Sequence, residues 1–349
     1  MTAHRPSPRN QLTRSHVMAR ALSRRRFISI TASAVGLALL PAGAGAREGV
    51  ETVTWAGQAL GAAASMTVHH TDKAEAELLV RQALAELSRL ELIFSLYRTD
   101  TALSELNRTG VLAAPPRELV DILGAARVIW ERTGGAFDPS VQPLWSLLAR
   151  HFGGADPDPS GPSEGRLREA LDLVGYGDVL VSEDRIALGR RGMALTLNGI
   201  AQGFVTDRIV AVLRRGGVAN SLVDMGEIRA LGSRPDGSPW RVGVGFDRQG
   251  AGLQRVLEIA DKAVATSSPD GYRFAKGRRF NHLIDPRSGL GASRYRSITV
   301  VAPDATTADA FSTGFSLLPP EDIRKIAAAW PGLQVQLREA SDTGSLLEF

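Results

Sequence analysis

The residues best suited to chemistry fall in two short segments near the end of the chain. Residues 281–289 combine His282, Asp285 and an arginine at a sharp turn, and a second segment carries Asp309 and Thr313 four positions apart on an expected helix. Positions i and i+4 share one helix face, so these two oxygen-bearing side chains can meet one ion. Carboxylate, hydroxyl and carbonyl oxygens suit a hard cation such as Mg²⁺. The two segments together predict a metal-assisted phosphate site.

A chemical role for His282 is one of two interpretations of this residue. It lies three residues before Asp285, close to an arginine as well. A neutral imidazole in such surroundings can accept a hydroxyl proton near neutral pH. The alternative is a structural histidine, and the sequence leaves both interpretations open.

A strand-to-helix junction supplies a candidate anion site. The expected strand Ala194–Leu197 runs through Asn198 and Gly199 directly into an expected helix. The first N–H groups of a helix have no intrahelical partners and carry the positive end of its dipole, so they bind anions. Such junctions are common, so a ligand-binding role for this one is supported only by the functional groups near it.

Two aromatic residues could hold a flat heterocycle. A loop with two glycines places Phe137 beside Asp138, and Tyr97 follows the end of an expected helix. The alternative is that Phe137 fills the core and Tyr97 lies half-exposed on the surface. The hydroxyl-rich segment 265–268 precedes a turn, for which ordinary turn chemistry is an equal explanation.

The elements that must position these groups are short strands interrupted by a few helices. Strands are expected within 52–70 and at 186–188, 194–197, 221–223, 241–244, 256–259, 280–284 and 297–301, and helices at 73–96, 117–132, 199–214 and 305–318. The strands outnumber the helices and do not alternate strictly with them. This pattern predicts an α+β fold rather than a doubly wound parallel sheet.

The first 46 residues have the pattern of an export signal and are expected to be removed. They contain seven arginines and no acidic residue, with the twin-arginine pattern Ser23–Ile28, the apolar run Ile28–Leu40 and the cleavage pattern Ala44–Ala46. The run is too short to span a bilayer, and no later segment is apolar enough to do so. We therefore expect a periplasmic protein without a membrane span.

Charge and cysteine content narrow the function classes further. Loss of the signal changes the formal charge from +4 to −3, so the basic isoelectric point belongs to the signal and nucleic acid is not an expected partner. The chain contains no cysteine, which excludes disulfides and a lipidated cysteine. Dinucleotide-binding, Walker A and nucleophile-elbow motifs are also absent from the sequence.

Seven segments, in their order and spacing, resemble the FAD:protein FMN transferase (ApbE) family over most of residues 47–349. They are Phe94–Tyr97, Leu103–Asn107, Gly135–Asp138, Asn198–Gly203, Ala263–Ser267, His282–Gly289 and Ala308–Ala310. The resemblance implies a single T-fold-like α+β domain with mixed, mainly antiparallel sheets. It also implies an enzyme that uses FAD and Mg²⁺, joins the FMN phosphate to a threonine hydroxyl of another protein and releases AMP.

The resemblance also assigns roles to individual residues. His282 would be the base and Asp285 its orienting partner. Contacts to FAD would come from Met66, Tyr97, Ala136, Phe137, Asp138, Thr196, Gln202 and Ile284. The metal would be held by the Gly199 carbonyl, Asp309, Ser312 and Thr313. The implied acceptor is an exported flavoprotein with an FMN-binding domain, such as a respiratory electron-transfer protein.

The chain departs from the family pattern at four positions. The family's opening Met-Gly-Thr signature appears here as Ser65-Met66-Thr67, without the glycine. Thr196 replaces an aspartate, Gln202 replaces a lysine or glutamate, and Ser312 replaces an acid found in some members. Two other functions are compatible with the same residues. One is a Mg²⁺-dependent FAD pyrophosphatase, with water as the nucleophile, and the other is an exported protein that binds FAD without cleaving it.

Overall fold

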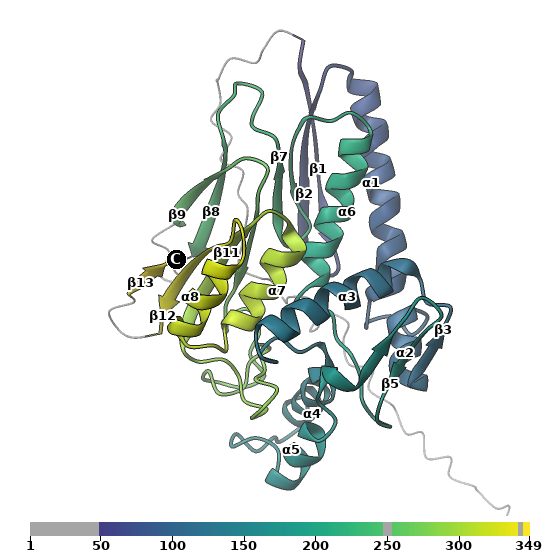
Figure 1. Cartoon of the computed structure of the whole chain (residues 1–349), viewed down its shortest axis with the longest axis vertical. Helices are drawn as coiled ribbons and strands as arrows, with labels where there is room; N and C mark the ends of the chain where they lie inside the picture. The colour runs from purple at the N-terminus through teal and green to yellow at the C-terminus, as the bar shows by residue number, and fades with distance from the viewer. Residues whose placement is uncertain (1–48, 247–252, 341–344) are drawn as a thin grey trace, which may run out of the picture.

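The computed structural model describes residues 49–246, 253–340 and 345–349 (Figure 1). The predicted export signal, residues 1–46, lies outside the described residues, and so does the residue pair that follows it. Within the described part of the chain, no helix is long and apolar enough to cross a membrane.

An eight-stranded antiparallel sheet forms the centre of the fold. Its strands, in spatial order, are β1 (Glu51–Ala59), β2 (Ala62–His70), β6 (Asn220–Asp224), β7 (Ile228–Leu231), β10 (Ala263–Ser267), β11 (Tyr295–Ala302), β12 (Gln334–Glu339) and β13 (Leu346–Glu348). Every neighbouring pair in this order is antiparallel. The predicted α+β class with mainly antiparallel sheets is therefore confirmed.

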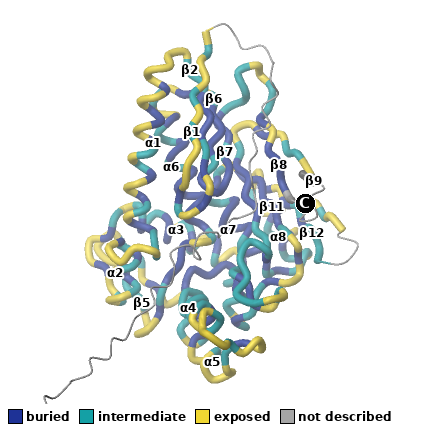
Figure 2. The backbone as a smooth tube through the Cα atoms, turned by 180° about the vertical axis from the view of Figure 1, so that it is seen from behind, coloured by how far each residue is buried: buried dark blue, intermediate teal, exposed yellow. Residues whose placement is uncertain are grey.

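The two faces of the large sheet bury different partners. Ala265 and Val300 pack on the helical side, whereas their neighbours Val264 and Val301 pack on the opposite side, as the two-residue period of a strand requires. The opposite side is covered by a hairpin of β8 (Trp240–Phe246) and β9 (Leu253–Ile259). The sheet is thus buried on both faces around its centre, and Figure 2 shows buried residues concentrated along its inner strands.

Three helices lie across the helical face: α1 (Lys73–Phe94), α6 (Ala201–Arg215) and α7 (Ala305–Phe315) (Figure 1). Helix α1 begins at Asp72, whose side chain accepts hydrogen bonds from the backbone N–H groups of residues 74 and 75. Its buried residues recur at helical spacing on one stripe. The remaining helices are α2 (Ala102–Thr109), α3 (Arg117–Arg132), α4 (Gln142–Phe152), α5 (Glu164–Leu171) and α8 (Pro320–Ala329).

Two smaller units complete the described structure. Strands β3 (Val111–Ala113), β5 (Arg185–Leu188) and β4 (Val179–Val181) form a separate sheet in that order. Helices α4 and α5 share a small core with the segment that contains Phe280 and Ile284, and this unit lies at the lower end of the molecule in Figure 1. The second unit matters for function because it carries the His282 segment.

Two predicted strands do not form, because their backbone groups bond to scattered partners and not to one neighbouring strand. At Ala194–Leu197 the amide of Asn107 bonds both the N–H and the carbonyl of Leu195, at 2.7 and 2.8 Å. At Phe280–Ile284 the structure has only isolated bridges, and the Asn281 side chain bonds the Leu283 N–H and two carbonyls. In both segments an asparagine side chain supplies part of the hydrogen bonding that a neighbouring strand would provide.

One central strand was not predicted from the sequence, and it runs into the turn expected after residue 268. Residues 265–268 belong largely to β10, which lies between β7 and β11 with four of its five residues buried. Its short small-residue sequence gave no alternation of polar and apolar residues, since both faces are covered. The helices α1, α3, α6 and α7 agree with prediction to within a few residues at each end.

Candidate active site

A close crossing of α6 and α7 brings the predicted metal ligands together. A methyl group added to Gly199 would come within 2.8 Å of the Thr313 hydroxyl oxygen. One added to Gly203 would come within 2.8 Å of the Asp309 Cβ atom and would overlap the carbonyl oxygen of Ala305. Glycine at both positions is therefore needed for the start of α6 to contact α7 directly.

The carboxylate of Asp309 is held at the beginning of α6. Its Oδ2 atom accepts a hydrogen bond from the backbone N–H of Gly203 at 3.0 Å. Burial raises the pKa of Asp309 to about 7, and the nearby carboxylate of Asp207 acts in the same direction. A cation placed beside a carboxylate buried in this way would strongly stabilise its ionised form.

A second buried acid, Glu227, lies close to Asp309 and was not predicted from the sequence. It is 2% exposed, and its Oε2 atom has no hydrogen-bond partner within the described structure. Burial, together with the charges of Asp309 and Asp224, raises the pKa of Glu227 well above its usual range. The only sequence signal was its place in the glycine-containing turn between β6 and β7.

Three hydroxyl groups line the same crossing. The Ser267 hydroxyl, at the end of β10, lies 2.7 Å from the Ser312 hydroxyl and 3.5 Å from the Thr313 hydroxyl. Ser312 also donates to the Asp309 carbonyl at 2.9 Å. The strand end and the helix face therefore present their oxygens to one region, together with the turn at Gly199.

This donor set fits Mg²⁺ and does not fit zinc. Within the described residues, no three histidine, cysteine or acidic side chains gather at metal-ligand spacing. The candidate ligands are one carboxylate, two hydroxyls and the Gly199 carbonyl, all of them hard oxygens. Four protein ligands leave an octahedral ion with open positions. Mg²⁺ commonly fills such positions with waters or with phosphate oxygens.

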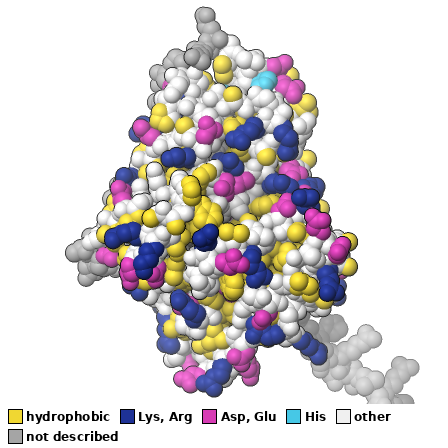
Figure 3. All heavy atoms as spheres, in the orientation of Figure 1, with side chains coloured by type: hydrophobic (Ala, Val, Ile, Leu, Met, Phe, Trp, Pro, Cys, Tyr) yellow, Lys and Arg dark blue, Asp and Glu magenta, His cyan; other side chains and the backbone are white. Residues whose placement is uncertain are grey.

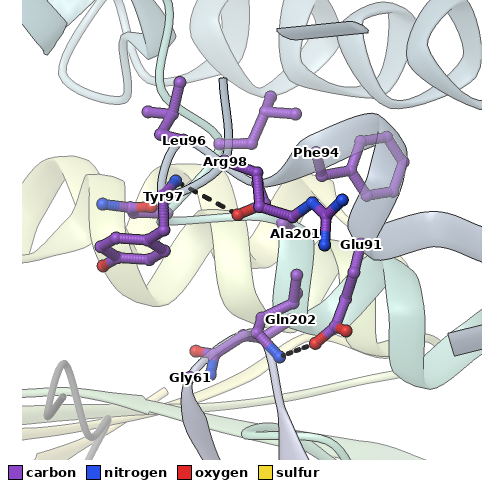
Figure 4. A pocket seen from close by; sticks show the side chains of 12 residues that line it. Gly61, Glu91, Phe94, Leu96, Tyr97, Arg98, Ala201 and Gln202 are labelled. Carbon is purple, nitrogen blue, oxygen red and sulfur yellow. Dashed lines mark hydrogen bonds between the residues drawn. The ribbon is translucent and has the colours of Figure 1, made fainter. Parts of the chain in front are cut away.

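Two cavities flank this region and share Asn198 as a lining residue. The larger, about 170 Å³, is bounded by the end of α1, the turn at Gly61 and the start of α6. Figure 4 shows Tyr97, Glu91 and Gln202 around it. The smaller, about 60 Å³, is bounded by the loop at Phe137, by Gly199 and Thr313, and by His282.

Most of the predicted FAD contacts line one of these two cavities. Tyr97, 55% exposed, and the buried Gln202 line the larger cavity. The smaller cavity is lined by Ala136, Phe137, Asp138, Thr196 and Ile284. Met66 is the exception, since it is 1% exposed in the core and lines neither cavity. Its side chain faces inward from β2, and the structure gives it a packing role.

Asp138 organises the loop that forms one wall of the smaller cavity. Its Oδ1 atom accepts from the Ser140 N–H and hydroxyl, and its Oδ2 atom accepts from the Trp130 indole and the Tyr176 N–H. Burial raises the pKa of this carboxyl, and the four hydrogen bonds oppose the shift. Because these bonds occupy both oxygens, Asp138 shapes the cavity through the loop it fixes.

His282 is oriented by the backbone and not by Asp285 as predicted. Its Nδ1 atom lies 3.1 Å from the carbonyl oxygen and 3.3 Å from the amide nitrogen of Tyr272. The carboxylate of Asp285 instead accepts from the backbone and guanidinium of Arg287, because the turn brings these two residues together. A proton on Nδ1 that donates to Tyr272 leaves Nε2 as the basic nitrogen.

Burial keeps the imidazole of His282 neutral. Desolvation lowers the pKa of His282 to about 4, and the contact with the Tyr272 carbonyl opposes the shift only partly. A neutral imidazole beside a cavity that also touches Gly199 and Thr313 can take a proton from a hydroxyl placed there. The geometry thus combines a candidate base, an oxygen cluster for a cation and two cavities for a larger ligand.

Comparison with known proteins gives one consistent result. The ApbE family model matches residues 60–337. A FAD:protein FMN transferase of Treponema pallidum (strain Nichols) is 30% identical over 285 residues, which are 74% of this chain and 76% of the relative. One from Klebsiella pneumoniae (strain 342) is 28% identical over 284 residues, 77% and 79% of the two chains.

Solved structures agree with the sequence relatives. The flavin transferase ApbE from Vibrio cholerae superimposes with a TM-score of 0.74 at 25% identity, covering 86% of this chain and 97% of that one. The ApbE protein of Thermotoga maritima gives a TM-score of 0.73 at 28% identity, covering 85% and 96%. The chain therefore belongs to the ApbE family, whose curated relatives are enzymes named FAD:protein FMN transferase.

Proposed function

We propose that this flavin transferase moves the FMN half of FAD to a threonine hydroxyl of an exported or membrane flavoprotein, with Mg²⁺ bound between Asp309, Ser312, Thr313 and the Gly199 carbonyl. The observation that carries the proposal is the contact between the turn at Gly199 and the α7 face. Gly199 and Thr313 line the smaller cavity, and the Asp309 carboxylate is held at the nearby Gly203 N–H, which supports a shared oxygen site for one ion.

The residues of the site divide the reaction between them. His282 Nε2 would accept the proton of the acceptor hydroxyl, whose oxygen then forms the bond to the FMN phosphorus. The phosphoanhydride bond to AMP breaks, and AMP leaves with the bridging oxygen. Bound Mg²⁺ would neutralise charge on the diphosphate oxygens. The positive end of the α6 dipole would stabilise charge on the same oxygens.

Thr196 and Gln202, two of the positions at which the chain differs from the family pattern, line the cavities with neutral polar side chains. Thr196 is 9% exposed, and its hydroxyl oxygen accepts from the Asn198 N–H at 3.3 Å. Gln202 packs its amide against Gly226, where a side chain would overlap it. We infer that FAD is bound here by shape and neutral hydrogen bonds at these positions.

The decisive experiment incubates the purified protein with FAD, Mg²⁺ and a folded flavin-acceptor domain, followed by mass spectrometry of the acceptor. One added FMN on a threonine, with an equal amount of AMP, is the expected result. Rapid release of free FMN and AMP without labelling would identify a pyrophosphatase. Tight FAD binding without turnover under any divalent metal would identify a flavin-binding protein.

We also propose export to the periplasm by the twin-arginine route, on the strength of the pattern in residues 23–28. A reporter fused behind residues 1–46 should reach the periplasm. Replacing Arg24 and Arg25 together by lysine should leave it in the cytoplasm. Export of the doubly substituted fusion at the normal level would contradict the proposed route.

A further inference from the structure

The segment that carries His282 has a charge opposite to that of the rest of the chain. Residues 271–296 contain seven lysines and arginines and one acid, Asp285, whereas the chain without its signal has a formal charge of −3. Elsewhere the charges are mixed, and Figure 3 shows acidic and basic side chains interspersed over one face of the molecule. A local concentration of one sign beside a reaction site attracts partners of the other sign.

Part of this segment folds back on itself and ends at His282. We call residues 272–282 the basic hairpin. Tyr272 and His282 contact each other at its base, Phe274 donates to the Phe280 carbonyl at 3.0 Å, and Gly277 turns the tip with a φ of +88°. Arg279, next to the tip, precedes His282 by three residues, which span at most about 10 Å at the rise of an extended chain. Arg279 therefore lies within about 10 Å of the candidate base along its arm.

The basic hairpin is anchored firmly on the small helical unit. The Phe280 ring lies 5.0 Å from that of Phe152, and the Phe274 ring lies 5.6 Å from that of Trp145, both on α4. A surface fixed in this way binds without first paying the entropy of ordering a loop. The arms of the hairpin are thus held beside His282 by packing at Phe274 and Phe280.

Two cations at the tip remain available for a partner. Asp270 pairs with Arg273 and lies 3.8 Å from Arg278. Lys276 and Arg279 are exposed, and neither has a carboxylate within ion-pair distance in the part of the chain that the structure describes. The Arg279 guanidinium lies 5.2 Å from the Phe280 ring centre, which holds it over the arm of the hairpin.

We propose that the tip of the basic hairpin, through Lys276 and Arg279, docks an acidic segment of the acceptor protein that flanks the modified threonine. This inference rests on the proposed transfer to a threonine hydroxyl. With the threonine at His282, the distance to Arg279 corresponds to about three extended residues. Acidic side chains beginning about three positions from the acceptor hydroxyl would therefore meet Lys276 and Arg279.

The test measures binding of labelled short peptides by fluorescence anisotropy at low and moderate salt. Each peptide has a central threonine with flanking residues that are all aspartate, all asparagine or all lysine. The proteins are the wild type, the variant Lys276→Glu with Arg279→Glu, and a matched control, Lys73→Glu with Arg81→Glu. The control makes the same charge change at exposed positions on α1. FAD binding is measured in all three proteins.

The wild type and the control should bind the aspartate peptide about ten-fold more tightly than the asparagine peptide, a difference that salt reduces. The hairpin variant should lose this preference and keep its affinity for FAD. Equal binding of aspartate and asparagine peptides to the wild type would overturn the proposal. An equal loss in the control would also overturn it, as would a parallel loss of FAD affinity, which would assign the cations to the diphosphate. Because peptide binding needs no turnover, failure of the transfer reaction is a separate result.

Discussion

At the residue scale, the proposed chemistry depends on the neutral imidazole of His282. Replacing His282 by alanine should slow transfer about 10²- to 10⁴-fold, the usual contribution of a general base. FAD affinity should change little, because the imidazole is proposed to contact the acceptor. Single-turnover kinetics with equilibrium FAD titration separate the two effects. A transfer rate equal to that of the wild type would remove His282 from the chemistry.

The pH dependence of the transfer rate follows from the burial of the same residue. The pKa of His282 is lowered to about 4, and only the deprotonated ring can act as a base. Activity should therefore stay level as pH falls through the range in which an ordinary histidine titrates, and decline only near pH 4. Initial rates in overlapping buffers provide the measurement. A decline centred on the ordinary histidine pKa would mean that the ring is solvated in the working enzyme.

Asp224 offers a second residue-scale prediction, concerning stability. Burial raises the pKa of Asp224 to about 6 from 3.8, so the folded state favours the protonated acid and loses stability as pH rises through this window. Asp224→Asn keeps an acceptor for the Gly226 N–H and should stabilise the protein at pH 8 by about 1–2 kcal/mol, with no gain at pH 3.5. Denaturant unfolding at the two pH values tests this. An equal gain at both would exclude the ionisation as its cause.

At the element scale, the crossing of α6 and α7 is what assembles the site. Gly203→Ala introduces a methyl group into the Ala305 carbonyl and the Asp309 side chain, so the helices must separate. Overpacking of this kind costs about 1–3 kcal/mol, and we expect transfer activity to fall with it. Thermal unfolding and transfer assays measure both effects.

Gly124→Ala provides the matched control for that substitution. Gly124 lies in α3, and a methyl group there meets no atom within 4 Å. The change should stabilise the helix by up to about 1 kcal/mol through helix propensity and leave activity intact. If Gly203→Ala proved as harmless as this control, the tight crossing would not be needed for function.

The sequence was most informative where periodicity and end signals were strong. The helix at Arg117–Arg132 agrees with prediction to the residue, because prolines precede it and glycines follow it. The predicted strand at Ala194–Leu197 failed because Asn107, far away in the chain, supplies its hydrogen bonds. No local pattern reports such a contact, and the same limit applies to the strand β10, buried between two neighbours.

At the scale of the whole molecule, much of the candidate site could be predicted from the sequence. The residues that orient or surround its functional groups could not. Asp309 and Thr313 follow from helical spacing. The structure places Thr313 against Gly199, which family resemblance had assigned to the same ion, and Asp309 against Gly203. Tyr272 as the partner of His282 and Glu227 beside Asp309 were missed, since both are tertiary neighbours without a local signature. Met66 was assigned to FAD by resemblance alone, and the structure places it in the core, outside the lining of both cavities.

One measurement tests the central claim, the cation site between α6 and α7, most directly. It is the rate of AMP release during transfer, recorded as Mg²⁺ is titrated into FAD-loaded wild type and into Asp309→Ala. The wild type should depend strictly on the divalent cation, and the variant should stay inactive at every Mg²⁺ concentration while still binding FAD. The same rate and the same Mg²⁺ dependence in both proteins would contradict the account.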